Sequence, residues 1–517
     1  MTRTAPIGGF GGRTADAVFG RTAGGWVRRL DSTVAFRLAL VTVAAALLIA
    51  DTANRGLRVK WDGDTFFILR MALDGPLVFM SPTAPFLFPD VAVLSLAGVA
   101  TQDPFDLGIM GQVGLALLTL GLLAACVGGT LAVTLLGLLW ILGPVQTAPS
   151  YHAGVVALTC LLILAERIGG GGLRRAAGSV GVACDPFLAF VYLVDELRYR
   201  TLGAGRDAPA GPSTALAFAV SVAAGLAVAV FFSLKVPQYV YFAAVFALFA
   251  GSVVAGRAVV RAIVARLTGH STNVDTLFLV ALASGLLAVA AGARIAGDGQ
   301  IGRYTAAVAV GAAAVALVAL PRVRALPWRP SMVAIGLSAV IAATLFAIPD
   351  SRADYRAVRD RFDCLERALA VRDIDRVVTD YWTNQSLATL PPARVRSAQI
   401  DLVRSGHFLW NLDLRELALT ASHAVRDDQR CRTRYAPGRE TYAYFCAFEG
   451  NIPVDAGSVE TLCGDFTLFR LRRDHPDDPI VQDPGIAIPA LRWTVFRTRL
   501  DQNIRRLTGH IGMRDAP

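Results

Sequence analysis

Residues 108–125 read Gly-Ile-Met-Gly-Gln-Val-Gly-Leu-Ala-Leu-Leu-Thr-Leu-Gly-Leu-Leu-Ala-Ala, and this stretch contains no charged side chain. A helix needs roughly 20 apolar residues to cross the hydrocarbon core of a bilayer, with about 17 as a lower limit. The stretch therefore predicts a transmembrane helix. Similar apolar runs, several of which need flanking residues to reach full length, recur at 36–50, 131–145, 153–165, 215–234, 239–259, 276–293, 305–320 and 332–348.

Composition supports the same fold class. The chain has 517 residues, of which 54% are hydrophobic and 17% are charged, which is too apolar for a soluble globular protein. Charge is sparse in 36–349 but frequent in 350–517. We therefore predict a transmembrane domain at 36–349, followed by a soluble domain of mixed α and β structure at 350–517. Residues 1–35 lack the apolar core of a signal peptide and are expected to form a cytoplasmic tail.

The net charge of +10 does not call for a nucleic-acid partner, because the cytoplasmic loops of membrane proteins collect Arg and Lys. A tenth apolar run, 177–194, is interrupted by Asp185-Pro186. If it does not cross the membrane, the Arg-rich segments 167–206, 257–266 and 322–329 all lie inside. We therefore predict about nine transmembrane helices. Residues 177–194 are then expected to form a re-entrant or interfacial segment. Asp185 would lie near the inner face, where a structural turn is favoured over the role of an intramembrane functional acid.

An odd number of crossings with the N-terminus inside places 350–517 outside, in the periplasm, with the protein in a bacterial inner membrane. The cysteines of this domain agree with an oxidising compartment. They are even in number, which predicts disulfides whose pairing stays open. A zinc site is the alternative, but no Cys-x-x-Cys pair is present and His is scarce. These cysteines are Cys364, Cys431, Cys446 and Cys463.

The same orientation makes 51–106 the first and largest external loop. Its residues 61–64 read Trp-Asp-Gly-Asp, directly after a basic run of Arg55, Arg58 and Lys60. Residues 64–73 are apolar but too short to span a bilayer, and Arg70 within them can extend its head group to water. We expect this segment to be a helix lying in the membrane interface.

At this point the chain resembles the GT-C class of membrane glycosyltransferases. That class has many spans, an acidic motif and an interfacial helix in the first external loop, and often a C-terminal external domain. The resemblance implies that the catalytic acid is Asp62 or Asp64, with Asp51 a less favoured third candidate. Here a glycine separates two acids that are adjacent in some members, so the resemblance does not choose between them. Three further external acids have no motif to support them: Asp90, Asp103 and Asp106.

The resemblance also implies a polyprenyl-phosphate-linked sugar as donor and a glycan, lipid or protein of the cell envelope as acceptor. A carboxylate would act as general base, while arginines or a divalent cation would neutralise the departing phosphate. If a metal is bound, Mg²⁺ or Mn²⁺ on Asp62 and Asp64 suits the oxygen ligands. The candidate substrate-binding residues are Arg55, Arg58, Lys60, Arg70 and His152.

Simpler interpretations stay open for each of these features. The Asp-Gly-Asp turn can be an ordinary solvated turn, and the basic run can attract anionic lipid head groups. His152 lies at an outer membrane edge, where an interfacial aromatic role competes with acceptor binding or proton transfer. The aromatic clusters at 380–383 and 407–411 are expected to fill the core of the external domain, with stacking on sugar rings as the alternative.

The competing function is that of a non-catalytic polytopic membrane protein. It would be either a carrier of lipid-linked sugars or a scaffold whose external domain binds a partner. The spans are rich in Ala, Leu and Val with few central charges, which argues against ion-coupled transport but not against a scaffold.

Overall fold

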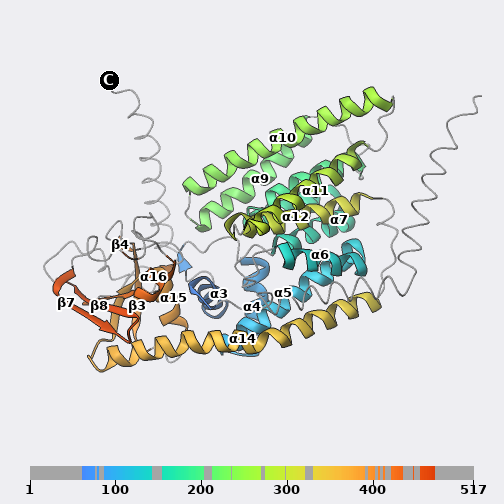
Figure 1. The fold of residues 1–517 in the computed structure, drawn as a ribbon. Helices are drawn as coiled ribbons and strands as arrows, with labels where there is room; N and C mark the ends of the chain where they lie inside the picture. Colours follow the sequence, from blue (N-terminus) through green and yellow to red (C-terminus); the bar gives the residue numbers. More distant parts are fainter. Residues whose placement is uncertain are drawn as a thin grey trace, which may run out of the picture.

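The computed structural model describes 61–75, 79–80, 87–142, 154–202, 212–233, 236–268, 274–296, 299–320, 330–390, 394–401, 406–407, 412–413, 421–434, 446 and 454–471. These residues are mostly helical, with a small sheet in the C-terminal part of the chain (Figure 1). The helices and the sheet lie at opposite ends of the view and are joined along its lower side by one long helix.

The predicted apolar runs from 108 onward lie largely within helices, whereas the run 36–50 lies outside the described residues. By length and composition, four helical segments are apolar enough to cross a membrane: Pro104–Val127, Gly154–Cys184, Tyr239–Arg266 and Val274–Ala293. The larger number of about nine crossings stays a prediction. The helices that carry the runs are α5 (Pro104–Val127), α6 (Gly129–Leu142), α7 (Gly154–Cys184), α9 (Pro212–Ser233), α10 (Val236–Thr268), α11 (Val274–Ile295), α12 (Gly299–Ala319) and α14 (Pro330–Ala370).

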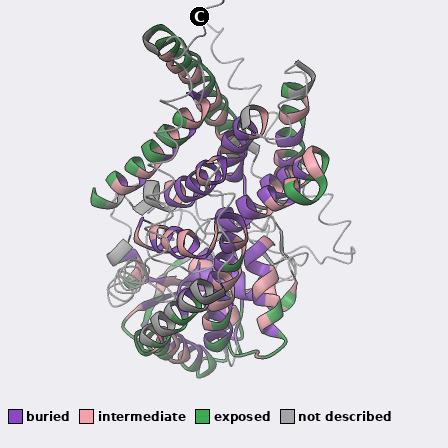
Figure 2. Cartoon of the chain, turned by 90° about the vertical axis from the view of Figure 1, so that its right-hand side faces the viewer, coloured by how far each residue is buried: buried purple, intermediate pink, exposed green. Residues whose placement is uncertain are grey.

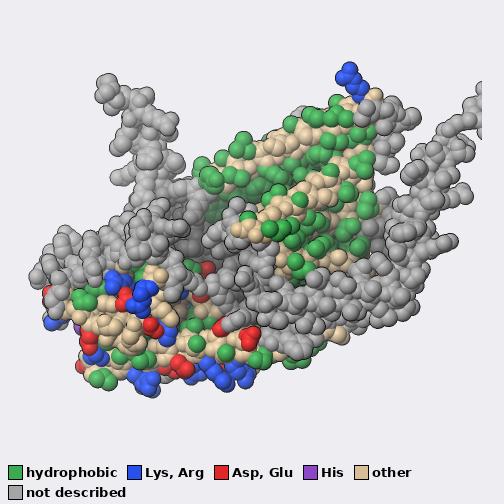
Figure 3. Space-filling view, in the orientation of Figure 1, with side chains coloured by type: hydrophobic (Ala, Val, Ile, Leu, Met, Phe, Trp, Pro, Cys, Tyr) green, Lys and Arg blue, Asp and Glu red, His purple; other side chains and the backbone are tan. Residues whose placement is uncertain are grey.

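The helical part has a buried centre and an apolar outer surface. Small residues of α12, such as Ala309 and Ala314, are fully buried, and buried residues follow the middle of the helices in Figure 2. On α10, by contrast, Tyr241 and Leu248 are 73% and 74% exposed. Hydrophobic side chains cover the upper helices in Figure 3, as on helices that face lipid.

The segment around the tenth apolar run forms a buried helical hairpin. The chain reverses inside α7 at Gly170, whose φ of +65° favours glycine, so that Gly181 returns to the side of Leu158. It reverses again at Asp185, where the side chain accepts a hydrogen bond from the Phe187 amide (3.0 Å), and continues as α8 (Leu188–Leu202). The apolar residues around this turn pack inside the helical core, so protein covers the segment, as the re-entrant alternative requires.

Arginines that the topology argument treats as loop charges are also buried here. Arg174 of α7 is fully buried and pairs with Asp195 (Nε to Oδ2, 2.7 Å) and Glu196 (Nη2 to Oε2, 2.6 Å) of α8. Arg198 donates from Nε to the other oxygen of Asp195 (2.8 Å). The pairs of Arg174 join α7 to α8, as does a further pair between Arg198 and Glu166 of α7. Arg174 and Arg198 are therefore structural and carry less weight in the orientation argument.

The C-terminal part contains both helices and strands, as predicted, and six of its described strands form one sheet. The strand order of this sheet is β4-β3-β2-β6-β8-β7, in which β2 is parallel to both β3 and β6 and the other pairs are antiparallel. Helix α15 (Tyr381–Thr389) connects β2 to its parallel neighbour β3. The strands are β2 (Arg376–Thr379), β3 (Arg396–Asp401), β4 (Gly406–His407), β6 (His423–Asp427), β7 (Val454–Leu462) and β8 (Phe466–Leu471).

The cysteines of this part form two disulfides, Cys364–Cys463 and Cys431–Cys446. The predicted disulfides are thus confirmed, and the zinc alternative is wrong, because all four sulfur atoms are bonded in pairs. The first disulfide joins α14 to the turn between β7 and β8. The second joins α16 (Asp428–Arg434) to Cys446.

Helix α14 joins the two predicted domains, and strand β1 (Phe79–Met80) and helix α3 (Gly63–Asp74) of the first contact the second. Helix α14 has 41 residues, about 60 Å of helix, and continues through Pro349 where the boundary at 349/350 was placed. Its last turns bury Leu365 and Leu369. Strand β1 (Phe79–Met80) of the first predicted loop pairs antiparallel with β5 (Leu412–Asp413). Strand β1 is therefore positioned by both parts of the chain.

Candidate functional site

The Trp-Asp-Gly-Asp stretch forms the N-terminus of helix α3 (Gly63–Asp74). Asp62 is the N-cap, with an extended backbone and a side chain that accepts a hydrogen bond from the Thr65 amide (3.3 Å). The first amides of a helix lack partners within it, and Asp is among the residues that best satisfy them. Asp62 is 5% exposed. Its carboxylate therefore has a structural role at this helix end.

Trp61 fixes this turn to two other helices. Its indole nitrogen donates a hydrogen bond to the Ser351 carbonyl of α14 (2.8 Å). Its ring lies 5.6 Å from Phe105 of α5 and 4.7 Å from Tyr355 of α14, measured between ring centroids. A bulkier residue at Gly108 would collide with the indole. The acidic turn is thus held where α3, α5 and α14 meet.

Asp64 differs from Asp62 in both exposure and contacts. Its side chain is only partly buried, and its Oδ1 accepts a hydrogen bond from the Tyr381 hydroxyl (3.1 Å). Tyr381 opens α15, whose N-cap is Asp380; that carboxylate accepts from the amides of Trp382 (2.9 Å) and Thr383 (3.3 Å). Two helix N-termini therefore meet here, one from each predicted domain.

Gly63 is what allows the two helices to come this close. A Cβ built on Gly63 would lie 2.6 Å from Cε3 and 2.9 Å from Cα of Trp382, closer than carbon atoms tolerate. The glycine between the two acids, which departs from the adjacent acids of some GT-C members, thus has a local cause. It makes room for the backbone and indole of Trp382.

Helix α3 is present as predicted, but its environment differs from the expected membrane interface. Arg70 is 6% exposed and donates from Nη1 to Oε1 of Gln385 in α15 (2.9 Å). Gln385 in turn donates to Gln399 of β3 (3.2 Å). The expectation that Arg70 extends to water is wrong, and its burial argues against direct contact with substrate. The residues of α3 with no exposed surface are Phe66, Phe67, Ile68, Leu69 and Met71.

The structure does not test several other predicted site residues. Asp51, the basic run and His152 lie outside the described residues: Arg55, Arg58, Lys60 and His152 keep their predicted roles as expectations only. Of the remaining loop acids, Asp103 is the N-cap of α5 and accepts from the Asp106 amide (3.0 Å), while Asp106 is exposed. Neither has a described contact with the Asp62–Asp64 turn.

Asp90 is a further buried acid that sequence reasoning named without a role. It lies in a short π-helical segment, η3 (Leu87–Val91), before α4 (Ala92–Gly98), and is 1% exposed. Burial raises the pKa of Asp90 well above its ordinary value, and the charge of Asp185 raises it further. Asp185 therefore lies on the same side of the helices as η3. The topology expected from the sequence places Asp90 at the outer face and Asp185 near the inner face, and this proximity contradicts that pair of placements.

The aromatic cluster at 380–383 has its predicted core role in Tyr381, and stacking on sugar rings stays a prediction. Tyr381 is fully buried, as expected of a core residue, yet its hydroxyl reaches Asp64. Trp382 carries the guanidinium of Arg430, whose Cζ lies 4.1 Å from the centre of the ring. Sequence reasoning missed Arg430, and only its position beside a disulfide-bonded cysteine sets it apart along the chain. The side chains of 407–411 are not among those described.

Asp380 completes the charged groups around Trp382. Burial raises the pKa of Asp380, while the hydrogen bond from Thr383 and the positive charge of Arg430 oppose that rise. Among the described residues, no three His, Cys, Asp or Glu side chains are grouped so as to hold a metal ion. Asp62 and Asp64 thus have no described third ligand of that kind, and their carboxylates already accept hydrogen bonds from Thr65 and Tyr381. The Mg²⁺ or Mn²⁺ stays a prediction.

Comparison with known proteins adds no assignment to this geometry: no family model, no curated protein and no solved structure matches the chain.

Proposed function

We propose that the chain is a membrane glycosyltransferase of the GT-C type and that Asp64 is its general base. One observation carries the proposal: Asp64 is partly exposed, does not cap its helix, and is hydrogen-bonded by Tyr381 from the C-terminal part of the chain. The Asp64 carboxylate thus lies where the N-terminus of α3 meets α15 of the C-terminal part. A lipid-linked donor and a water-soluble or surface acceptor need such a place to reach one another.

The reaction that this arrangement suits is sugar transfer from a polyprenyl-phosphate donor. Asp64 accepts the proton of an acceptor hydroxyl as the oxygen attacks the anomeric carbon. The new glycosidic bond forms as the bond from that carbon to the phosphate oxygen breaks, and the polyprenyl phosphate leaves with the electron pair. Tyr381 donates to Oδ1 of Asp64 and so orients the carboxylate.

The architecture is consistent with this proposal. Four segments long and apolar enough to cross a membrane, together with the exposed apolar surface of α10, support an integral membrane protein. The two disulfides are compatible with a periplasmic C-terminal part. We infer that the protein lies in a bacterial inner membrane with a cytoplasmic N-terminus, and that its acceptor is a glycan, lipid or protein of the cell envelope.

Asparagine substitution separates the two acids. Asn caps helices as well as Asp does, so Asp62→Asn should leave fold and activity nearly unchanged. Asp64→Asn removes the base and should lower transfer by roughly 10²–10⁴-fold. The measurement is incorporation of radiolabelled sugar from a polyprenyl-phosphate donor into membranes that contain equal amounts of each variant. Asp106→Asn, at an exposed acid, is the matched control.

Two results would overturn the assignment. If Asp62→Asn is inactive and Asp64→Asn is active, the base is the other acid. If both variants modify the glycan as the wild type does, the acidic turn is purely structural. The non-catalytic alternative, a carrier or a scaffold, then becomes the better function, as the capping role of Asp62 alone would suggest.

A further inference from the structure

The indole of Trp382 contacts both the Asp62–Asp64 turn and Arg430. One edge of the ring meets Gly63, next to Asp64, while one face carries the guanidinium of Arg430. Stacking on an aromatic ring holds a guanidinium in place but leaves its N–H groups without acceptors. In Arg430, Nε and Nη2 are buried and have no hydrogen-bond partner among the described residues.

The nearby carboxylates do not supply those acceptors, because other donors occupy them. Asp380 accepts from two amides of α15 and from the Thr383 hydroxyl (2.6 Å). Asp427 accepts at Oδ1 from Nη2 of Arg361 (2.6 Å) and from the backbone amide of Arg430 (2.9 Å). Among the residues that the structure describes, no carboxylate lies within ion-pair distance of the Arg430 guanidinium. Buried charged donors of this kind are costly unless an anion binds them.

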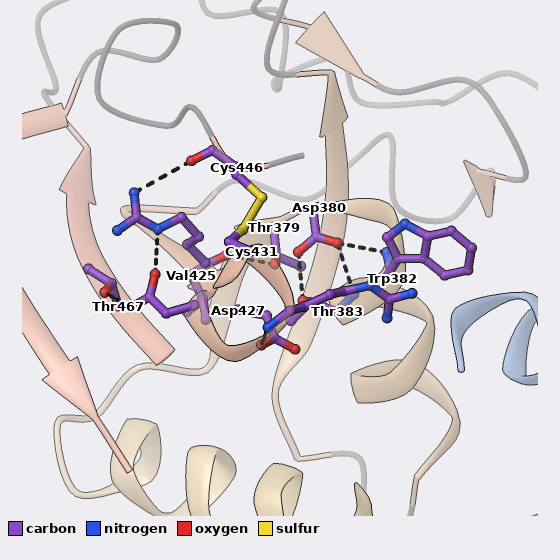
Figure 4. Close-up of a disulfide and its surroundings, with 12 residues drawn as sticks. Thr379, Asp380, Trp382, Thr383, Val425, Asp427, Cys431, Cys446 and Thr467 are labelled. Carbon is purple, nitrogen blue, oxygen red and sulfur yellow. Dashed lines mark hydrogen bonds and ion pairs between the residues drawn. A yellow bond between two sulfur atoms is a disulfide. The ribbon is translucent and has the colours of Figure 1, made fainter. Parts of the chain in front are cut away.

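The segment that carries Arg430 is rigidly held. Cys431, the next residue, forms a disulfide with Cys446, and the Arg430 amide is tied to Asp427. Figure 4 shows this disulfide above β6, with Asp380 and Trp382 beside it. A guanidinium held in one place before a ligand arrives loses little conformational freedom on binding. The position of Arg430 is therefore suited to binding an anion.

We propose that Arg430 forms a phosphate-binding subsite on the face of Trp382. Nε and Nη2 lie on one side of a guanidinium and match two oxygens of a phosphate group, a pairing that lysine does not reproduce. The phosphate belongs either to a lipid-linked substrate or to a water-soluble phosphorylated one. Its connection to sugar transfer rests on the function proposed above, whereas the anion site itself does not.

Equilibrium binding to the full-length protein in phosphatidylcholine nanodiscs tests the subsite. The probes are undecaprenyl phosphate, the uncharged undecaprenol, and glucose 1-phosphate as the water-soluble phosphate. Arg430→Met should weaken binding of one phosphate probe roughly tenfold or more, the loss expected for charge-assisted hydrogen bonds. The probe affected identifies the source of the phosphate, and undecaprenol binding should not change.

Arg432→Met is the matched control, because it removes the same charge from an exposed side chain of the same helix. Arg430→Lys keeps the charge and should recover only part of the affinity. The subsite is overturned if Arg430→Met binds both phosphates as the wild type does, if neither phosphate binds the wild type, or if Arg432→Met shows an equal loss. A subsite that binds phosphate in a protein without transferase activity would refute the proposed function alone.

The variants must keep the native fold for this comparison. Equal unfolding temperatures and an intact Cys431–Cys446 disulfide on a non-reducing peptide map establish that. If Arg430→Met fails to fold, the comparison between wild type and Arg430→Lys still decides, because the lysine variant keeps the cation on the ring. Equal phosphate affinity in these two proteins would overturn the paired-oxygen geometry.

Discussion

Replacing Gly63 with alanine is expected to force α3 and α15 apart. The added Cβ would lie 2.6 Å from Cε3 and 2.9 Å from Cα of Trp382. Contacting carbons prefer roughly 3.5–4.0 Å, so one helix has to retreat by about 1 Å. Rotating the indole relieves only the first contact, since the second involves the backbone. Overpacking costs about 1–3 kcal/mol, and the better helix propensity of alanine offsets up to about 1 kcal/mol.

The same retreat should affect activity more than stability. The Tyr381 hydroxyl lies 3.1 Å from Asp64, and a further 1 Å would break that hydrogen bond. A misplacement of this size at a catalytic group costs roughly 10²-fold in rate. We therefore expect the free energy of unfolding to fall by about 1–2 kcal/mol and sugar transfer to fall by about two orders of magnitude.

Thermal unfolding of the detergent-purified protein and the radiolabelled transfer assay measure the two effects. Gly121→Ala is the control, because a Cβ at that helical position meets no atom within 4 Å. In a Trp382→Ala background the Gly63→Ala penalty should shrink but not vanish, since the 2.9 Å contact to Cα remains. A Gly63→Ala protein as stable and as active as the wild type would refute the close approach and the role assigned to it.

Two further predictions concern stability. Because the pKa of Asp90 is raised in the folded protein, the protonated form stabilises the fold in acid, and that contribution is lost as pH rises through the folded pKa. Asp90→Asn should therefore unfold at a higher temperature than the wild type at pH 8, with the difference shrinking toward pH 4; a difference independent of pH would contradict the shift. Cys364→Ser/Cys463→Ser opens a loop of 99 residues and should cost about 1–2 kcal/mol more than Cys431→Ser/Cys446→Ser, whose loop spans 15 residues, in denaturant unfolding. Equal losses from the two pairs would show that chain entropy does not set their contributions.

Apolar runs predicted helices well, because each helix in a bilayer must satisfy its backbone internally and therefore needs a long apolar segment. The same signal could not identify what covers an apolar face. Helix α3 was predicted from 64–73, yet its apolar side chains pack against protein, chiefly α4, α5 and α15, where a lipid surface was expected. Burial in lipid and burial in protein select the same residue types. Arg70, which was expected to extend to water, was the only local clue, and its partner Gln385 lies 315 residues away.

Charge was less informative than expected for a related reason. An arginine counts as a loop residue only if it is solvated, and Arg174 is instead buried between two acids of α8. The reversal at Asp185 brings them together, and the sequence marks that turn only by Asp185-Pro186. Likewise, an even number of cysteines predicted disulfides, but the pairing follows from which strands and helices are neighbours.

Both halves of the site share one local design, and that design decides how mutations there should be interpreted. Asp62 caps α3 and Asp380 caps α15, and each is followed within two residues by a group that faces the other helix. Replacing either cap with alanine would destabilise a helix end by about 0.5–2 kcal/mol and so lower activity without any catalytic role of the acid. Asparagine preserves the cap and removes the charge, so only Asp64 of these acids should be sensitive to it. The comparison of Asp64→Asn with Asp62→Asn therefore tests catalysis by Asp64, because both variants are expected to keep the fold.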